Sequence, residues 1–385
     1  MDPREFADEA HAEELTVVSR GGEYIVVGHA EVTAVAQDPA RFSSQVSAHL
    51  QIPNGLDGSE HASARRLVDE YLEPHRVCEL LPQFNGAARS AIAESAAGAE
   101  GETAGSVRIE NLAQLYAVRA MQAWLQWPQH LTQRLLDWID DNDQARGSGD
   151  REWTARVAAE FDDIIRVAVA EAPEDSETHR LATQHGLEHA EVVSILRNWT
   201  AGDLGSMARC IGVMAVAFAQ TPALQDRVRE ILSQQNLQGK AEPVHREFDA
   251  IANEILRIDN PFVSNRRITT CPVDIGQTHL PENALVRIHW TAANRDPKVF
   301  DGFDPAGNAE TNLVWGTGPH YCPGKTVSLL ELRAFWTQVL SRFELVSVDE
   351  SGEDIRGVRS SHGGWDKAPV SLRVRDVQGN DDFKN

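Results

Sequence analysis

The stretch Trp315-Gly316-Thr317-Gly318-Pro319-His320-Tyr321-Cys322-Pro323-Gly324 places one cysteine in a glycine-rich loop. The apolar spacing of residues 326–340 directly after it predicts a buried helix. A cysteine before a helix N-terminus has its thiolate favoured by the helix dipole and by free backbone N–H groups. Such a thiolate can be the only protein ligand of haem iron, because the porphyrin supplies the equatorial ligands. The alternative is a turn around a small buried cysteine.

The order of aromatic, glycine, histidine and cysteine residues in this loop is more specific than the cysteine alone. It resembles the haem-binding loop of the cytochrome P-450 family, F-G-x-G-x-H-x-C-x-G, with a tryptophan in place of the usual phenylalanine. The resemblance implies haem b with Cys322 as the axial ligand of its iron. It also implies that the loop residues around the haem are Trp315, Gly316, Gly318, His320 and Gly324.

Composition narrows the class of protein. The chain has 385 residues, 42% of them hydrophobic, so it can build a large core. Its net charge of −22 weighs against nucleic-acid binding, which needs a basic surface. The N-terminus is charged and no apolar run is long enough to span a membrane, so we expect a soluble cytoplasmic protein. The four cysteines lie far apart, which predicts neither a disulfide framework nor a local zinc site.

The pattern of elements favours one domain over residues 1–385. Residues 16–27 read as a hairpin across Gly21-Gly22, and short strands return at about 267–290. Helical patterns fill about 30–257 and 325–342, interrupted by loop composition at 97–105, 141–150 and 172–178, and 376–385 reads as a polar tail. This predicts a mainly α fold with a smaller β-rich part. The resemblance implies a triangular helical body with haem between a central long helix and the helix after the cysteine loop.

Two further motifs agree with the family. Glu254-Ile255-Leu256-Arg257 matches its E-x-x-R, and the two charged residues share a helix face. The resemblance implies that this pair braces the fold behind the haem. The arginine that usually joins the pair is missing, and Asn308 stands in its region as a hydrogen-bonding substitute. Residues 291–297, Thr-Ala-Ala-Asn-Arg-Asp-Pro, resemble the family's S-A-N-R-D-P phrase.

Haem carries two propionates, which need cationic or hydrogen-bonding partners when they are partly buried. Residues 60–65 match the family's E-H-x-x-x-R and offer His61 and Arg65 on one helix face. The resemblance implies two more partners, Arg267 at the start of a strand and His320 in the cysteine loop. Each alone would more often be an ordinary surface charge.

The oxygen-activating helix departs from the family pattern. Residues 191–218 read as a long buried helix with Ala201-Gly202-Asp203-Leu204-Gly205-Ser206 at its middle, where the family has A-G-x-D/E-T. No alignment yields an adjacent acid and alcohol. Asp203 and Ser206 share a face and could relay protons with water. Otherwise Ser206 bonds back within the helix. The candidate oxygen-side residues are thus Ala201, Gly202, Asp203, Gly205 and Ser206.

The sequence is compatible with three reactions and with one function that is not catalytic. The first is monooxygenation of a small or medium hydrophobic substrate with dioxygen and two electrons. The second is a peroxide-driven reaction, and the third is oxidative coupling or desaturation without oxygen insertion. A haem sensor without turnover is the alternative from another class. The phrase at 199–206 is similar to one in bacterial members that act on small methoxyarenes.

Substrate and electron donor are constrained only indirectly. Residues 43–58 are short for the family, and candidate pocket residues there are Val46, Ala48, His49, Leu50, Ile52 and Leu56. Val263 and Ser264 are further candidates. The chain has no room for a fused flavin domain, so we expect a ferredoxin and its reductase as partners. Candidate docking residues are basic: Arg65, Arg66, His75, Arg76, Lys325 and Arg333.

Overall fold

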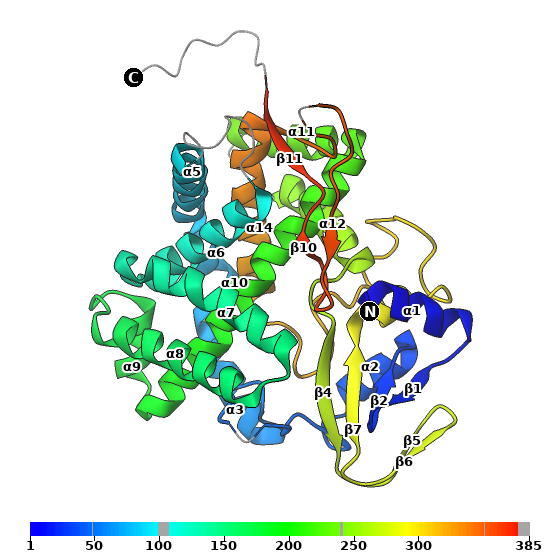
Figure 1. The fold of residues 1–385 in the computed structure, drawn as a ribbon. Coiled ribbons are helices and arrows are strands. Elements are labelled where there is room, and N and C mark those ends of the chain that lie inside the picture. Colours follow the sequence, from blue (N-terminus) through cyan, green and yellow to red (C-terminus); the bar gives the residue numbers. More distant parts are fainter. Residues whose placement is uncertain (48, 99–107, 239–241, 350, 376–385) are drawn as a thin grey trace.

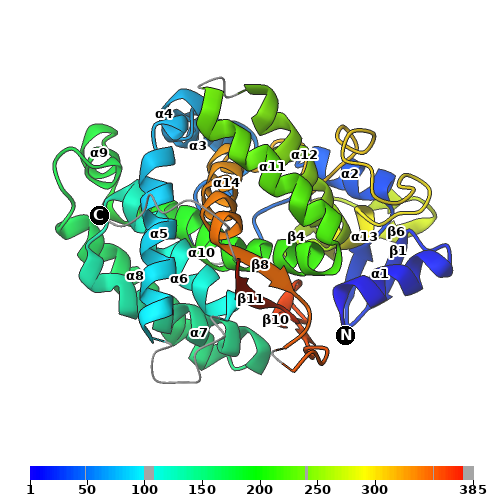
Figure 2. The same cartoon turned by 90° about the horizontal axis from the view of Figure 1, so that it is seen from above.

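A helical body lies beside a smaller strand-rich part, as the sequence predicts (Figures 1 and 2). The computed structural model describes residues 1–47, 49–98, 108–238, 242–349 and 351–375. The predicted tail, Ala48, and residues 99–105 of the first predicted loop lie outside these residues. The helices of the body are α3 (Gly58–Tyr71), α4 (Pro74–Cys78), α5 (Leu81–Gly98), α6 (Ile109–Leu125), α7 (Thr132–Ser148), α8 (Arg151–Ala170), α9 (Glu177–Gln184), α10 (His189–Gln220), α11 (Pro222–Gln238), α12 (Glu242–Ile258) and α14 (Lys325–Arg342).

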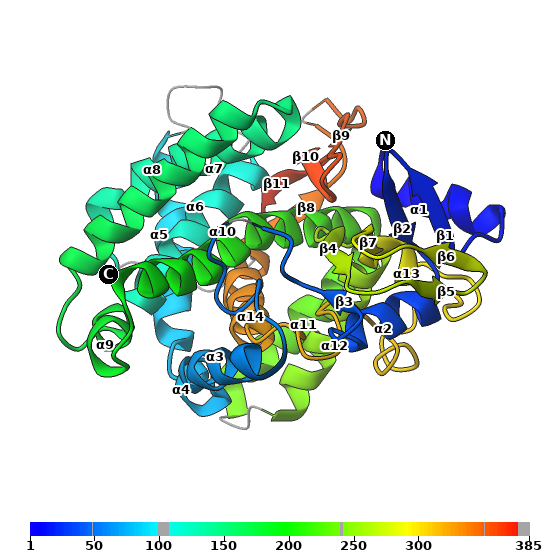
Figure 3. The same ribbon diagram turned by 90° about the horizontal axis from the view of Figure 1, so that it is seen from below.

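Helix α10 runs through the middle of this body. It begins at a capping box in which the side chains of Glu188 and Glu191 each accept from the other's backbone N–H. It packs on α6, α8 and α12, and α14 crosses beneath it (Figure 3). Among the described residues, α10 is the one helix long and apolar enough to cross a membrane, and most of its surface is buried inside the protein. A helix that is apolar on all sides is expected at the centre of a large core.

The strand-rich part is a five-stranded sheet in the order β1-β2-β7-β4-β3. The strands are β1 (Val17–Arg20), β2 (Glu23–Val26), β3 (Phe42–Ser43), β4 (Ser264–Thr269) and β7 (Leu285–His289). The predicted hairpin forms at Gly21-Gly22, whose φ values of 62° and 83° favour glycine. Three two-stranded ribbons complete the strands: β5 (Val273–Ile275) with β6 (Thr278–Leu280), β8 (Phe343–Val346) with β11 (Ser371–Val374), and β9 (Val358–Arg359) with β10 (Trp365–Lys367).

Several elements differ from the sequence prediction. Five short strands of the described chain lie outside the predicted strand-rich ranges of about 16–28 and 267–290: β3, β8, β9, β10 and β11. Helix α1 (Pro3–Ala12) precedes the hairpin and packs on α13 (Trp290–Ala293); Asp2 caps it and Pro3 occupies its first position. Residues 141–148, predicted as a loop, continue α7, because one face of this polar helix packs on α8. The buried Trp138 ring stacks on Phe161 of α8 at 3.8 Å between centroids, which outweighs the weak local helix propensity.

Candidate cofactor site

A cavity of about 290 Å³ lies between α10, α14 and the cysteine loop. Cys322 and Trp315 line it from the loop, Val327 from α14, and Gly202, Asp203, Ser206 and Cys210 from α10. Arg267 and His320 also line it, together with Gly316, Thr317 and Gly324. The cavity thus collects the cysteine and most of the predicted cofactor residues from segments that are far apart in sequence.

The cysteine loop is fixed by its backbone. The Cys322 N–H donates to the Trp315 carbonyl at 2.9 Å, and the Tyr321 N–H donates to the Gly318 carbonyl at 3.0 Å. Gly318 has a φ of 73°, and a Cβ there would lie 2.5 Å from the Ala36 carbonyl oxygen of α2 (His29–Gln37). Gly318 is therefore required for the loop to pack on α2, whereas a Cβ at Gly324 would meet only the Cys322 sulfur at 3.9 Å.

Two thiols reach the cavity, and their surroundings differ. Burial raises the pKa of Cys322, while the backbone N–H groups of Gly324 and Lys325 lower it. The N–H groups at the start of α14 lower the pKa of Cys322, as the sequence predicts, but burial has the larger effect in the protein without a cofactor. Burial raises the pKa of Cys210 to about 12, and no backbone donor opposes it. Cys322 is therefore the thiol better prepared to become a thiolate, and a metal cation would complete its ionisation.

Buried basic groups gather at one side of the cavity. The rings of His61 and His320 lie 4.1 Å apart, and His61 Nε2 is buried without a hydrogen-bond partner. The Arg267 guanidinium donates to the Arg266 carbonyl at 2.8 Å, with no carboxylate at ion-pair distance in the described chain. His320 Nε2 lies 3.0 Å from Ser44 Oγ and 3.6 Å from an Asp57 oxygen.

Electrostatics at this cluster favour an anion. Burial, then the charges of His61 and Arg267, lower the pKa of His320 to about 4. Burial also lowers the pKa of His61 and of Arg267. Asp57 is the acid that opposes these shifts. Arg267 is a buried cation with no carboxylate at ion-pair distance in the described chain, and the two imidazoles can donate hydrogen bonds, so the side chains present fit the propionates of a haem.

Two other predicted cofactor residues serve the loop itself. Arg65 Nη1 donates to the carbonyls of Pro319 and Tyr321, at 3.0 and 2.9 Å, and so ties α3 to the cysteine loop. Trp315 Nε1 donates to Asn253 Oδ1 at 2.7 Å, which fixes the indole at the cavity wall. In the described chain no three His, Cys, Asp or Glu side chains are grouped to hold a metal ion.

The bracing pair is present with its substitute partner. Arg257 and Glu254 form a buried ion pair with distances of 2.8 and 2.7 Å. Asn308 Nδ2 donates to Glu254 Oε1 at 2.7 Å, so it takes the place of the missing arginine. Arg257 also donates to the carbonyls of Asn294 and Gly302. The motif at 291–297 has a structural role here, because Asn294 Oδ1 accepts from the Leu313 N–H and Asp296 from the His29 N–H.

The polar residues of α10 point to different partners. Ser206 Oγ donates to the Gly202 carbonyl one turn earlier, which is the local bond that the sequence offers as an alternative to a relay. Gly202 and Gly205 have open space where a Cβ would stand. Ala201 lies within α10, and the structure describes only its backbone. Asp203 is the one acidic residue that lines the cavity.

Asp203 has a partner that the sequence reasoning missed. Glu331 of α14 is completely buried, and its carboxyl group lies within hydrogen-bonding reach of Asp203. Burial and the charge of Asp203 raise the pKa of Glu331 well above its ordinary value, and burial raises that of Asp203 to about 6. Both Glu331 carboxyl oxygens and Asp203 Oδ2 are buried without another hydrogen-bond partner in the described chain, so the fold favours a protonated form of each acid. A glutamate between Leu330 and Leu332 of an apolar helix is the signal that could have revealed the pair.

The chain is similar to known proteins in sequence and fold. The sequence pattern of the family described as Cytochrome P450 matches residues 214–358. The erythromycin C-12 hydroxylase of Saccharopolyspora erythraea is 24% identical, over 88% of this chain and 86% of its own. The cyclomarin C epoxidase of Salinispora arenicola is 25% identical, over 88% and 86%. A solved structure of P450 EryK with erythromycin B matches at a TM-score of 0.80 and 22% identity, covering 98% and 97% of the two chains.

Proposed function

The chain belongs to the cytochrome P450 family of oxidoreductases, and from this premise we propose that it is a haem-thiolate monooxygenase. Its substrate is a small or medium hydrophobic molecule, which it hydroxylates, O-demethylates or otherwise oxidises with dioxygen and two electrons. The observation that carries the proposal is the Cys322 thiol at a cavity of about 290 Å³ that the buried Arg267 and the half-buried His320 also line. The buried His61 packs against the His320 ring. The two relatives above are named as a hydroxylase and an epoxidase, which supports this reaction class.

The residues of the cavity divide into two roles. Cys322 Sγ would bind the iron, and His61, Arg267 and His320 would hold the propionates, with Arg65 securing the cysteine loop. When bound, haem supplies the redox centre, and electron donation from the thiolate favours oxygen activation. Gly202 leaves room on the α10 side of the cavity, and Gly205 lines the neighbouring cavity on the other side of Ser206.

Proton supply is the second part of the proposal. Asp203 lines the cavity, and the buried Glu331 of α14, which does not line it, interacts with Asp203, so the two carboxyl groups would act together. The proton of the pair is held more tightly by Glu331, so Asp203 would pass a proton to a group in the cavity after taking it from Glu331. Ser206 is the further candidate, although its hydroxyl donates to Gly202. This pair supports a dioxygen reaction over the peroxide-driven alternative, which needs no such proton donor.

The electron donor is proposed to be a ferredoxin, reduced by its reductase, in the cytoplasm. The expected basic patch is smaller than its sequence suggested. Arg333 is buried and lies 3.5 Å from Asp249, and Arg76 pairs with Glu177 at 2.5 Å. Arg66 and His75 remain exposed, and Lys325 remains half-buried. Arg65 pairs with Asp69 at 3.1 Å and His75 lies 3.4 Å from Glu73, so the charge that can attract an acidic ferredoxin is carried by Arg66 and Lys325.

Turnover measurements test the proposed reaction. The haem-loaded protein is given a panel of hydrophobic compounds, once with a surrogate ferredoxin and reductase under air and once with hydrogen peroxide. Product that requires dioxygen and the electron donor supports monooxygenation. Product with peroxide alone would make the enzyme a peroxygenase. If neither arm gives product while the thiolate-bound haem stays intact, the sensor alternative replaces the proposal.

A further inference from the structure

A second cavity, of about 630 Å³, adjoins the cofactor site. The two cavities share Ser206, Pro261 and Phe262 as lining residues, so they are neighbours across α10 and the loop before β4. The wall of the second cavity, here called the outer chamber, comes from α1, α7, α10, the strands β1, β2, β4 and β7, and the turn between β9 and β10. Val263 and Ser264, predicted from the sequence to face the substrate, line this chamber.

The outer chamber is basic in an acidic protein. Five of its lining residues are arginines and one, Asp143, carries a carboxylate. The chain as a whole has a net charge of −22, so composition alone would predict an acidic lining. The arginines are contributed by five different elements: Arg20, Arg146, Arg209, Arg266 and Arg287.

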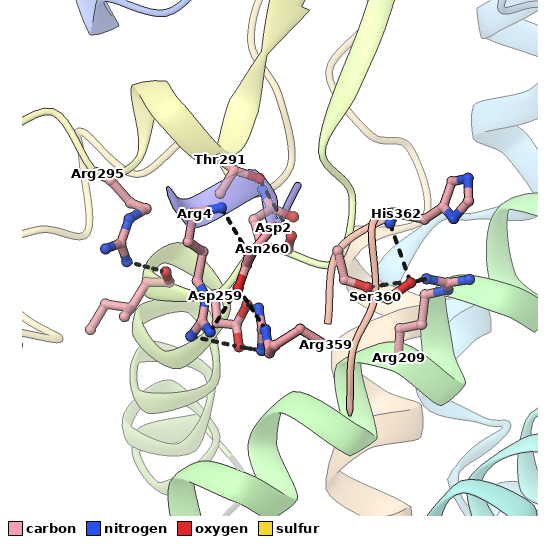
Figure 4. A network of polar contacts seen from close by, with 12 residues as sticks. Asp2, Arg4, Arg209, Asp259, Asn260, Thr291, Arg295, Arg359, Ser360 and His362 are labelled. Carbon is pink, nitrogen blue, oxygen red and sulfur yellow. Dashed lines mark hydrogen bonds and ion pairs between the residues drawn. The ribbon is translucent and has the colours of Figure 1, made fainter. Parts of the chain in front are cut away.

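Two of the five guanidinium groups are neutralised within the protein. Arg209 donates to Ser360 Oγ at 3.1 Å (Figure 4). It also lies 2.9 Å from Asp143 and donates to the Gly363 carbonyl at 3.0 Å. Arg287 forms an ion pair with Glu23 at 2.5 Å. These two residues are structural supports of the chamber wall and leave little charge for a ligand.

The other three guanidinium groups have no partner in the described chain. Arg20, Arg146 and Arg266 are exposed, and no hydrogen bond or ion pair engages their side-chain nitrogens. The charge of Arg146 reaches another group of the wall: burial, then the charges of Arg209 and Arg146, lower the pKa of His362 against the opposing charges of Asp143 and Asp366. The solvent side of the chamber therefore presents three uncompensated positive charges.

The rest of the wall is apolar. Its side chains come mainly from α1, α7, β2 and the loop before β4: Phe6, Ile25, Trp138, Ile139, Phe262 and Val263. A ligand that fits such a chamber has an apolar body and one anionic end. Guanidinium groups are well suited to bind carboxylate or phosphate oxygens, because their N–H donors match two oxygens at once.

We propose that the substrate is an amphipathic organic anion whose carboxylate or phosphate is held by Arg20, Arg146 and Arg266 while its apolar part extends toward α10 and the cofactor site. This inference rests on the proposed monooxygenase function, since it names the substrate class of that site. It predicts oxidation at an apolar carbon away from the anionic end.

Calorimetry with matched ligands tests the inference on the haem-loaded protein. Dodecanoate and dodecanol share one apolar chain and differ in charge. We expect dodecanoate to bind on the order of tenfold more tightly at low salt, and its advantage to shrink as salt screens the arginines. Dodecyl phosphate in a third arm distinguishes phosphate from carboxylate as the preferred group.

A combined variant identifies the residues. Arg20→Gln, Arg146→Gln and Arg266→Gln together should lower the dodecanoate-to-dodecanol affinity ratio, by about two- to fivefold for each arginine. Arg89→Gln is the matched control, because Arg89 is exposed on α5, does not line the chamber and has no hydrogen bond or ion pair in the described chain. The control should leave the ratio unchanged.

The outcomes separate this inference from the proposed function. Equal affinities for the acid and the alcohol, or a ratio that the triple variant does not change, would overturn the anionic substrate even if neutral compounds are oxidised. A protein without thiolate-bound haem would overturn the monooxygenase instead. The calorimetric ratio would still decide whether the chamber binds anions.

Discussion

Replacing Asp203 with asparagine should stabilise the folded protein at neutral pH. Burial raises the pKa of Asp203 from 3.8 to about 6, so its protonated form is the one favoured by folding. Below pH 3.8 the Asp203 carboxyl group therefore does not lower the free energy of unfolding. Its destabilising effect grows as the pH rises through 6, where the group ionises in the folded protein. Asparagine has the shape of the protonated acid at every pH and can still hydrogen-bond Glu331.

The size of the effect follows from the pKa difference. A shift from 3.8 to about 6 corresponds to roughly 3 kcal/mol of unfolding free energy. For a chain of 385 residues this is about 4 °C in Tm. We expect Asp203→Asn to unfold near the wild-type temperature at about pH 4, and about 4 °C above it at about pH 7.5.

Thermal unfolding of the haem-loaded wild type and variant at both pH values measures this difference. Asp2→Asn is a control of opposite sign: burial opposes the shift, but hydrogen bonds from Arg4 and the charge of Arg359 lower the pKa of Asp2 (Figure 4). Its stabilising effect is present above pH 3.8 and is lost as pH falls, so the variant should be the less stable protein at neutral pH. A Tm difference between Asp203→Asn and wild type that is the same at both pH values would refute the reasoning.

Three further changes probe other parts of the structure. Glu331→Gln should remove an infrared band of a protonated carboxylic acid and slow product formation about a hundredfold. The variant should lose little stability. An unchanged band would exclude Glu331 as the group that holds the proton. Gly318→Ala should cost about 2 kcal/mol or more in denaturant unfolding, because its Cβ would lie 2.5 Å from the Ala36 carbonyl oxygen. Gly352→Ala, where φ is also positive but no atom lies within 4 Å, should cost less, and equal losses would contradict the packing role of Gly318. Asn308→Ala should cost about 1–2 kcal/mol, because the buried Glu254 loses a hydrogen-bond donor. Unchanged stability would show that Arg257 and the Asp304 N–H satisfy this carboxylate without Asn308.

Features that depend on residues close together in the sequence were predictable. The cysteine loop, the pair Glu254 and Arg257, and the substitute donor Asn308 each depend on short spacing, so a motif identifies them. The hairpin at Gly21-Gly22 and the two long apolar helices follow from turn chemistry and periodicity. These are also the elements whose local preferences agree with the final fold.

Features assembled from distant segments were not predictable. Glu331 faces Asp203 only because α14 crosses beneath α10, and helix spacing within one segment cannot show a partner on another. The arginines of the outer chamber come from five elements between Arg20 and Arg287, and each reads alone as an ordinary surface charge. Residues 141–148 were misassigned because tertiary packing, rather than composition, keeps α7 helical there.

The carbon monoxide difference spectrum of the reduced, haem-loaded protein tests the central claim most directly. Two cysteines reach the cavity, so Cys322→Ser and Cys210→Ser form a matched pair of variants. The wild type and Cys210→Ser should show the red-shifted band of a thiolate-bound haem, and Cys322→Ser should lose it. A band that survives in Cys322→Ser, or that disappears in Cys210→Ser, would contradict Cys322 as the iron ligand.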